Sequence, residues 1–388
     1  MSTTVKTFQS SQAILPALSG QAGALKTILK TCLVDGAGAQ TVTISVASGV
    51  ATVTFPTAHG MLTDGILLVA GATPAALNGE QRITVVVNST TLKFNTTAVD
   101  GAATGTITAK LAPAGWSELF TGTNLTVLKP TAVEATGCVL RVDDTGTTTA
   151  RVRGFASMTD VSTGIGPFPE ESQVSGGLYW MKSGSADATA RPWILVADER
   201  GFYFCVLPSG GSFYTVYWAG DVASLKSGDA WSFMLAGDVA DRTAATSTPD
   251  GCMGYGGRSA RAGAYMPRAS AGLGGSVQVQ RIGQAQNGAT TDVYSGASGY
   301  SMAGDGPNPA NNGLLLTPLE LIVNGSRGVA PGLYHARNNW AATFASGTIV
   351  DGTDDLAGRR LLALRVGPAV GSLQTGTVFI DLTGPWSR

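Results

Sequence analysis

The sequence predicts a mainly β protein with a small inserted β-barrel module, a larger β-sandwich-like domain and one short N-terminal helix. Two observations indicate this fold class. Most apolar residues fall in short β-branched or aromatic runs bounded by Gly, Asn, Ser and Thr, which is typical of strands joined by tight turns. Only one stretch of the chain repeats its apolar residues convincingly at helical spacing. We therefore expect an N-terminal segment over residues 1–39, the small module over 40–110 and the large domain over 111–388.

The predicted helix lies in residues 21–36. Its apolar residues recur at intervals of three and four, so they would form one stripe on the helix surface. These residues are Leu25, Ile28, Leu29 and Cys32. Gly36 is placed to end the helix in a left-handed conformation. We expect the stripe to pack against the core, and docking onto a neighbouring subunit is the alternative.

The small module is predicted from six short β-branched runs separated by turn sequences such as ASG and NST. Six strands in so short a stretch favour a closed or nearly closed barrel, which removes exposed strand edges. The predicted strands span residues 41–46, 50–55, 65–71, 82–87, 91–95 and 105–110. His59 falls between two of these runs, in an Ala-His-Gly sequence, and is expected to be a turn residue rather than a catalyst.

Aromatic residues crowd the first half of the large domain, at alternate positions in consecutive predicted strands. This pattern favours a thick sandwich core. The alternative is a second, exposed aromatic face that would bind a ligand such as a glycan. The candidate residues for that face are Trp180, Trp193, Trp218 and Trp231.

Two Gly/Ser-rich stretches, at about 244–275 and 289–313, interrupt the strand pattern. Loops this long in a compact domain are usually functional or become ordered against a partner. We therefore expect them to contact other subunits. The arginines of the first stretch would pair with carboxylates of a neighbour, or simply keep the loop solvated. The candidate interface residues are Arg258, Arg261, Tyr265, Arg268, Tyr294 and Tyr300.

Charge and cysteine content exclude several classes of function. Only 13% of residues are charged, and the net charge is −1, with no basic stripe for binding a run of phosphates. Nucleic acid is therefore not expected as the primary ligand, and the low charge instead suits a subunit packed against others. The four cysteines are widely spaced, so we expect buried reduced thiols and no zinc site. Neither a signal peptide nor a membrane span is predicted.

No catalytic motif is apparent. Two histidines are few for a Ser-His-Asp or Cys-His arrangement, and neither a GxSxG elbow nor a phosphate-binding loop occurs. Three adjacent acid pairs would serve glycan cleavage only if they faced a shared groove, but each falls in a turn sequence. The pairs are Asp143-Asp144, Asp198-Glu199 and Asp354-Asp355. The last pair also leaves a calcium site open, although EF-hand spacing is missing. We expect no enzymatic activity, no cofactor and no bound metal.

Several segments of the sequence resemble parts of virion proteins of tailed bacteriophages. Residues 58–86 resemble a β module found in phage tail and fibre proteins. Residues 140–169, 177–204, 325–339 and the ending at 361–386 resemble uncharacterised virion proteins of Pseudomonas- and Burkholderia-type phages and prophages. The resemblance covers most of the chain and implies a structural component of the tail, neck or baseplate. It supplies no catalytic residue and no ligand.

The expected function is therefore that of a non-enzymatic virion subunit, made in the bacterial host cytoplasm. Its expected partners are other virion proteins and copies of itself, with a host surface glycan or protein as a further partner. The alternatives are a receptor- or glycan-binding tail tip or fibre protein, a capsid decoration or head fibre protein, and a depolymerase.

Overall fold

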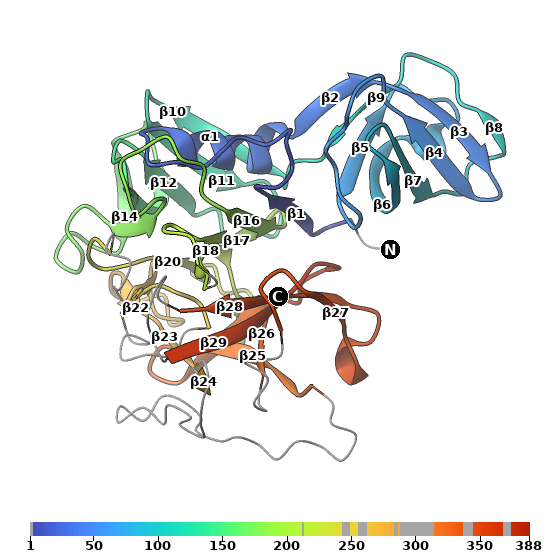
Figure 1. Cartoon of the computed structure of the whole chain (residues 1–388). Helices are drawn as coiled ribbons and strands as arrows, with labels where there is room; N and C mark the ends of the chain where they lie inside the picture. Colours follow the sequence, from blue (N-terminus) through green and yellow to red (C-terminus); the bar gives the residue numbers. More distant parts are fainter. Residues whose placement is uncertain are drawn as a thin grey trace.

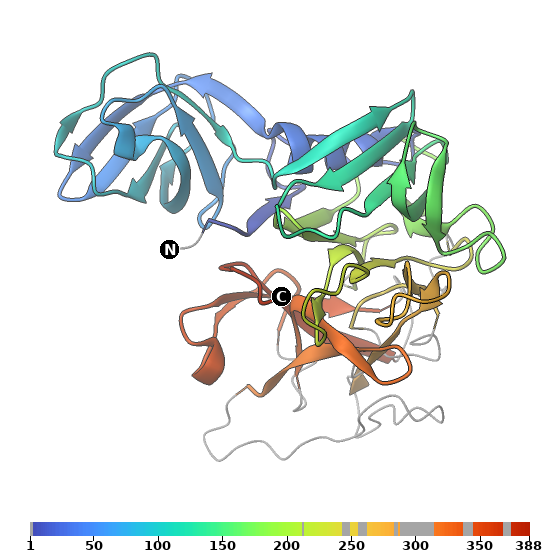
Figure 2. The ribbon, with the colours of Figure 1, turned by 180° about the vertical axis from the view of Figure 1, so that it is seen from behind.

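The structure is a computed structural model that describes residues 3–211, 213–242, 249–254, 262–282, 286–287, 314–336, 344–367 and 374–388. In these residues the chain forms four antiparallel sheets and one short helix, which confirms the predicted mainly β class. The sheet of the small module stands at one end of the molecule, and the other three sheets stack as layers beside it (Figure 1). The view from behind shows the same separation (Figure 2).

The helix forms where the apolar stripe predicts it. α1 spans Ala24–Lys30 and continues as a π-helical turn over Thr31–Asp35. All four stripe residues are fully buried, so the helix packs on the core as expected. The helical segment ends at Gly36, which has a φ of +75°. A side chain at Gly36 would also collide with the carbonyl of Leu111, so glycine is required there.

The small module is one curled eight-stranded sheet in the order β2-β9-β5-β6-β7-β4-β3-β8. All six predicted runs form strands, and the first run contributes to two of them. β2 and β8 are the edges of the sheet, so the curl does not close into a complete barrel. The strands are β2 (Ala37–Thr41), β3 (Thr43–Ala47), β4 (Val50–Thr54), β5 (Ile66–Ala70), β6 (Gly79–Asn88), β7 (Thr91–Asn95), β8 (Gly101–Ala102) and β9 (Thr108–Leu111). A 3₁₀ turn, Ala75–Leu77, precedes β6.

The first of the three stacked layers is a six-stranded sheet that lies beside α1 (Figure 1). Its strands are β10 (Trp116–Thr121), β11 (Leu125–Pro130), β12 (Val139–Asp143), β13 (Thr149–Met158), β14 (Gly164–Phe168) and β15 (Leu178–Met181). Strand β13 pairs with both β14 and β15, at different parts of its length. This layer is called the β10–β15 sheet below.

The second layer is a seven-stranded sheet, called the central sheet below. Its order is β1-β16-β17-β18-β20-β21-β22, so the N-terminal strand completes one edge. The strands are β1 (Lys6–Gln9), β16 (Trp193–Ala197), β17 (Gly201–Val206), β18 (Thr215–Asp221), β20 (Phe233–Ala236), β21 (Ala264–Met266) and β22 (Val277–Gln278). β21 lies within the stretch expected to be a long loop. That expectation is wrong for Ala264–Met266, because these three residues are buried and pair with β20 and β22.

The third layer is the C-terminal sheet, in which β25, β26, β29 and β28 are consecutive neighbours. Its strands are β19 (Ala223–Ser224), β23 (Gln280–Ile282), β24 (Gln286–Asn287), β25 (Leu316–Ile322), β26 (Ser326–Ala336), β27 (Ile349–Asp351), β28 (Arg360–Val366) and β29 (Gln374–Asp381). A 3₁₀ turn over Asp354–Leu356 precedes β28. The second predicted loop, 289–313, lies outside the described residues.

The central sheet is buried on both faces. Every residue of β16, β17, β18 and β20 is buried. Because side chains alternate across a strand, Phe202 and Phe204 pack toward the β10–β15 sheet, while Tyr203 and Cys205 pack toward the C-terminal sheet. The two faces belong to two separate hydrophobic clusters. The structure therefore has two apolar interfaces that share one sheet.

A fully buried ion pair joins the first layer to the helix. Lys182 and Asp144 are both completely buried, and their Nζ and Oδ1 atoms are 2.5 Å apart. Lys182 Nζ also donates to the carbonyls of Gln21 and Gly146. The second oxygen of Asp144 accepts the backbone N–H of Lys26, in the first turn of α1. The pair therefore fixes the start of the helix on the β12–β13 turn.

We predict that Lys182→Met lowers the free energy of unfolding by about 3–5 kcal/mol, because it leaves the buried Asp144 carboxylate without its cation. The double variant Lys182→Met/Asp144→Leu should regain most of this loss. Urea denaturation followed by tryptophan fluorescence measures both values. As a control, Asp351→Asn removes an exposed ion pair with Arg360 and should cost less than about 1 kcal/mol. Equal losses for the two single variants would contradict the role assigned to Lys182.

Candidate functional site

The predicted aromatic face does not exist as an exposed surface. Trp180, Trp193 and Trp218 are fully buried, and only Trp231 is partly exposed. Trp180 stacks on Phe204 at 5.7 Å between ring centroids and donates its indole N–H to the carbonyl of Ala236. Trp180, Trp193 and Trp218 are therefore core residues, as the favoured interpretation of the sequence predicts, and the alternative of a ligand-binding face is corrected for them. Both faces of the central sheet are covered by other layers, so alternating aromatics fill two cores instead of one core and one surface.

Two of the six candidate interface residues lie in the described part of the chain. Tyr265 is 5% exposed in β21, so it is a core residue and the prediction of an interface role is wrong for it. Arg268 is partly buried, with its guanidinium 4.4 Å from the centre of the Trp231 ring. It also donates to the carbonyl of Gly272, which shapes the turn that follows β21. The other candidates, Arg258, Arg261, Tyr294 and Tyr300, lie outside the described residues.

His59 lies in the connection between β4 and β5, as predicted, and both of its ring nitrogens are used. Nδ1 accepts the backbone N–H of Met61 at 3.0 Å, and Nε2 is 3.0 Å from the carbonyl oxygen of Asn88. A carbonyl can only accept, so Nε2 must carry the proton. The ring is buried and joins this connection to the β6–β7 turn. His335 is also buried, in β26.

The three adjacent acid pairs lie in separate turns: between β12 and β13, between β16 and β17, and before β28. Asp144 is bound by Lys182, and its neighbour Asp143 forms an ion pair with Arg141. Asp198 is bound by Arg388, with its two carboxylate oxygens 2.6 and 2.9 Å from the guanidinium nitrogens. Asp354 and Asp355 are exposed in the 3₁₀ turn before β28. Among the described residues, no group of three or more His, Cys, Asp or Glu side chains is arranged to hold a metal ion.

A polar cleft of about 680 Å³ is the candidate functional site in the described chain. One wall is the connection between β11 and β12, which contributes Glu134 and Thr136. The opposite wall is the connection between β18 and β20, which contributes Leu225 and Lys226. Arg200 and Arg388 also line the cleft. No histidine or cysteine lines it.

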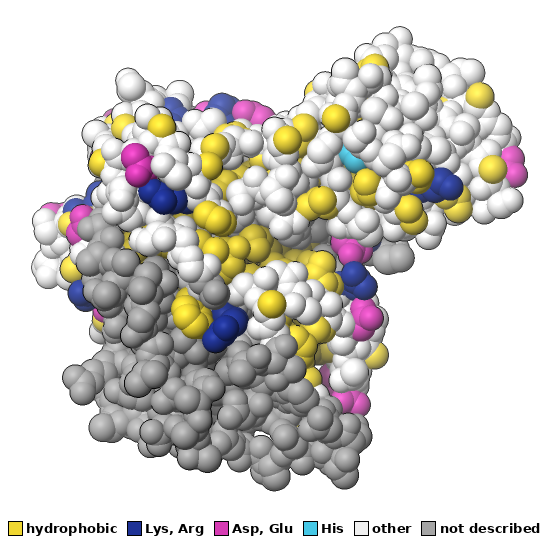
Figure 3. Space-filling model, viewed as in Figure 1, with side chains coloured by type: hydrophobic (Ala, Val, Ile, Leu, Met, Phe, Trp, Pro, Cys, Tyr) yellow, Lys and Arg dark blue, Asp and Glu magenta, His cyan; other side chains and the backbone are white. Residues whose placement is uncertain are grey.

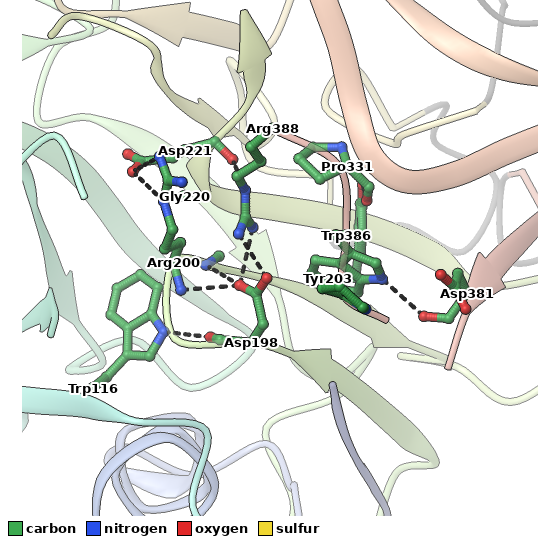
Figure 4. Close-up of polar contacts among 12 residues, drawn as sticks. Trp116, Asp198, Arg200, Tyr203, Gly220, Asp221, Pro331, Asp381, Trp386 and Arg388 are labelled. Atoms are coloured by element: carbon green, nitrogen blue, oxygen red, sulfur yellow. Dashed lines mark hydrogen bonds and ion pairs between the residues drawn. The ribbon is translucent and has the colours of Figure 1, made fainter. Parts of the chain in front are cut away.

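A network of charged side chains supports the cleft (Figure 4). Arg200 follows the β16 strand end and binds Asp221 through Nε and Nη2, both at 3.1 Å. Asp221 also accepts the hydroxyl and backbone N–H of Thr136. Arg388 binds Asp198 and donates from Nε to the carbonyl of Asp221. In this network each of the two aspartates is paired with an arginine, and the pairs hold three segments of the chain together.

An aromatic cluster lies directly beside this network, on the other side of the C-terminal segment. Trp386 is buried with its ring 5.6 Å from Tyr203 and 6.0 Å from Trp218. Its indole N–H donates to the carbonyl of Asp381. Tyr203 donates its hydroxyl hydrogen to the carbonyl of Pro331. The cluster therefore ties residues 381–388 to the central sheet, as Figure 4 shows.

The four cysteines are buried and reduced, as predicted. Burial raises the pKa of Cys138 and of Cys252 to about 12. It also raises the pKa of Cys32 and of Cys205 well above the usual thiol value. The thiolate is the nucleophilic form, so these side chains are unreactive near neutral pH.

Sequence reasoning missed this cleft because its walls come from segments that are far apart in the chain. No short motif joins Glu134, Arg200, Lys226 and Arg388. The turn sequence at Asp198 was noticed, but its arginine partner lies 190 residues away. Such a pairing has no signal in local periodicity.

No protein-family model matches the chain, and no curated protein matches it either. None of the helical segments in the described residues is both long and apolar enough to cross a membrane. The function is therefore inferred from the arrangement of the chain's own residues.

We predict that all four thiols of the native protein resist a disulfide exchange reagent at pH 8 and react together once the chain is denatured. The physical reason is their burial, which keeps them protonated and out of reach. Absorbance of the released thiolate measures both states. Rapid reaction of one thiol in the native state would contradict the buried positions of the cysteines. That cysteine would then be a candidate nucleophile.

Proposed function

We propose that the chain is a non-enzymatic structural subunit of a multi-subunit assembly that acts through protein–protein contacts. The observation that carries this proposal is the use of its ionisable side chains. In the described residues, the buried acids, arginines and histidines that catalysis would need are bound to structural partners. Asp144, Asp198 and Asp221 each bind a cation that belongs to a different segment.

The surface supports the same proposal. Large apolar side chains protrude from connections of the chain, including Val133 at 96% exposure and Leu225 at 70%. Val133 directly precedes Glu134 in one wall of the polar cleft, and Leu225 lies in the other wall. On the face shown in Figure 3, charged side chains are few and scattered. A charge-poor surface with protruding apolar residues suits permanent contacts better than free diffusion.

The cleft and its apolar rim are the contact surface that we assign to this function. Apolar side chains on both sides would be covered by a neighbouring subunit, and the polar floor would supply hydrogen bonds. Its paired charges suit a polar protein surface better than a phosphate chain.

The resemblance of residues 140–169 and 177–204 to tailed-phage virion proteins extends the proposal to a virion. The partners would then be other virion proteins and copies of this chain, in the tail, neck or baseplate. A capsid decoration or head fibre role uses the same kind of contact and differs only in location. A glycan-binding tip loses its main support, because Trp180, Trp193 and Trp218 are buried.

We predict that the purified full-length chain forms a stable multimer at micromolar concentration, and that Val133→Asp/Leu225→Asp shifts it toward smaller species. The new carboxylates would have to be desolvated in the contact, which is unfavourable. Light scattering coupled to size-exclusion chromatography measures the mass. As a matched control, Thr145→Asp/Thr123→Asp adds the same charge at two other connections and should leave the mass unchanged.

The assembly proposal would be contradicted if the unaltered chain were monomeric both as the isolated protein and in purified virions. A multimer that is equally stable in the Val133/Leu225 variant would instead move the contact to another surface.

A further inference from the structure

The buried carboxyl group of Asp238 holds a short segment of the chain, residues 249–254, against the central sheet. Asp238 lies two residues after β20 and is completely buried. Its backbone N–H and C=O bond to the C=O and N–H of Tyr179, at 2.8 and 2.9 Å. The backbone of Asp238 is therefore fixed between the central sheet and the β10–β15 sheet, and its side chain is free to serve a third segment.

That third segment is residues 249–254. Asp238 Oδ1 accepts the backbone N–H of Gly251 at 2.9 Å. Its other oxygen, Oδ2, accepts the hydroxyl of Tyr217 from β18 at 2.5 Å. Next along the segment, Met253 donates its backbone N–H to the carbonyl of Val216. The carboxyl group is thus one side-chain anchor at the point where the segment crosses the sheet, together with the thiol of Cys252, which accepts the backbone N–H of Val216.

Glycines allow the backbones to approach closely enough for this contact. A side chain at Gly251 would overlap the backbone of Gly237, and one at Gly263 would overlap the carbonyl of Gly237. Gly237 also donates its N–H to the carbonyl of Gly263 at 2.8 Å. Three backbones therefore meet in close contact at Gly237, the residue directly before Asp238.

Other ionisable groups surround the anchor. On the segment itself, Asp250 forms an ion pair with Arg242 at 2.8 Å, and the thiol of Cys252 is buried. From β23, Arg281 donates to the carbonyl of Asp250 and carries a pKa lowered by burial to about 10. From β21, Tyr265 lies near Asp250, which raises the pKa of Tyr265 further after burial. From β18, Tyr217 keeps its proton, because burial raises its pKa well above the usual value.

Two acids and two arginines thus form the charged group around the anchor. Asp238 and Asp250 balance Arg242 and Arg281 when both acids are ionised. Burial nevertheless dominates at Asp238 and raises its pKa to about 7, despite the hydrogen bonds from Gly251 and Tyr217. The carboxyl group therefore changes its charge close to neutral pH, in direct contact with the segment.

We propose that Asp238 is a pH-sensitive anchor that holds residues 249–254 firmly on the central sheet when it is protonated and loosens them when it ionises. Opening of the segment admits water to the carboxyl group. In the open form the carboxyl group returns toward its ordinary acidity, with a pKa of 3.8. The anchor links local opening of this segment to pH.

The direction follows from proton linkage. Between the open and closed pKa values, the closed form binds more protons than the open form, so raising the pH favours opening. The stabilisation of the closed form is complete at acid pH and is lost as the pH rises through about 7. The opening equilibrium should increase by up to ~10-fold per pH unit below that point and become constant above it.

Hydrogen–deuterium exchange of the full-length chain, followed by mass spectrometry from pH 5 to 8, tests the proposal. After correction for intrinsic exchange, protection of peptides covering residues 249–254 should fall with rising pH and level off above neutrality. Peptides from β4 and β7 of the small module, whose buried side chains belong to a different hydrophobic cluster from Cys252 and Met253, are the internal control in the same samples and should show no such slope.

Two variants make the outcome specific. Asp238→Asn keeps the shape and removes the titrating group, so the slope should disappear. Tyr217→Phe removes a hydrogen bond to the anion, so the levelling point should move to higher pH. A flat profile in the unaltered protein, or an unchanged slope in Asp238→Asn, would overturn the proposal. If Asp238→Asn fails to fold, an unshifted profile in Tyr217→Phe would overturn it equally.

Discussion

The constraint on which the rest of the structure depends is the burial of the central sheet on both faces. Strands β16, β17, β18 and β20 have no exposed residue, so they need an apolar layer on each side. The β10–β15 sheet supplies one layer and the C-terminal sheet supplies the other. Each buried aromatic side chain contributes roughly 1.5–3 kcal/mol through the area it removes from water. The concentration of aromatic side chains in these strands therefore follows from the layered architecture.

Several of the buried charges of the chain join its layers. Lys182 and Asp144 fix the helix on the first sheet, and Arg388 and Asp198 fix the C-terminal segment on the central sheet. Arg82 donates to the carbonyls of Leu382 and Thr383, which attaches the small module to the same region. Removing one partner of such a pair leaves a buried charge, so these contacts specify how the layers fit together.

Local patterns in the sequence predicted the parts of the fold that local patterns control. The stripe of Leu25, Ile28 and Leu29 predicted the helix, and β-branched runs predicted the small module, because both depend on neighbouring residues. The burial of Trp218 could not be predicted in this way. Aromatic side chains alternate along a strand in the same manner whether the second face of the sheet contacts water or another sheet. β21 was not predicted, because it is only three residues long and lies within a Gly-rich stretch of the sequence. The cleft was missed because its walls meet only through tertiary structure.

The measurement that tests this account most directly is hydroxyl-radical footprinting of tryptophan side chains in the native full-length chain, read out by mass spectrometry. If the central sheet is covered on both faces, Trp180, Trp193 and Trp218 will be protected, while Trp231 will be oxidised more readily. Denaturation should then expose all four. Rapid oxidation of Trp180 or Trp218 in the native chain would show that one face of the sheet is open. That result would contradict the layered architecture and restore an exposed aromatic face as a binding surface.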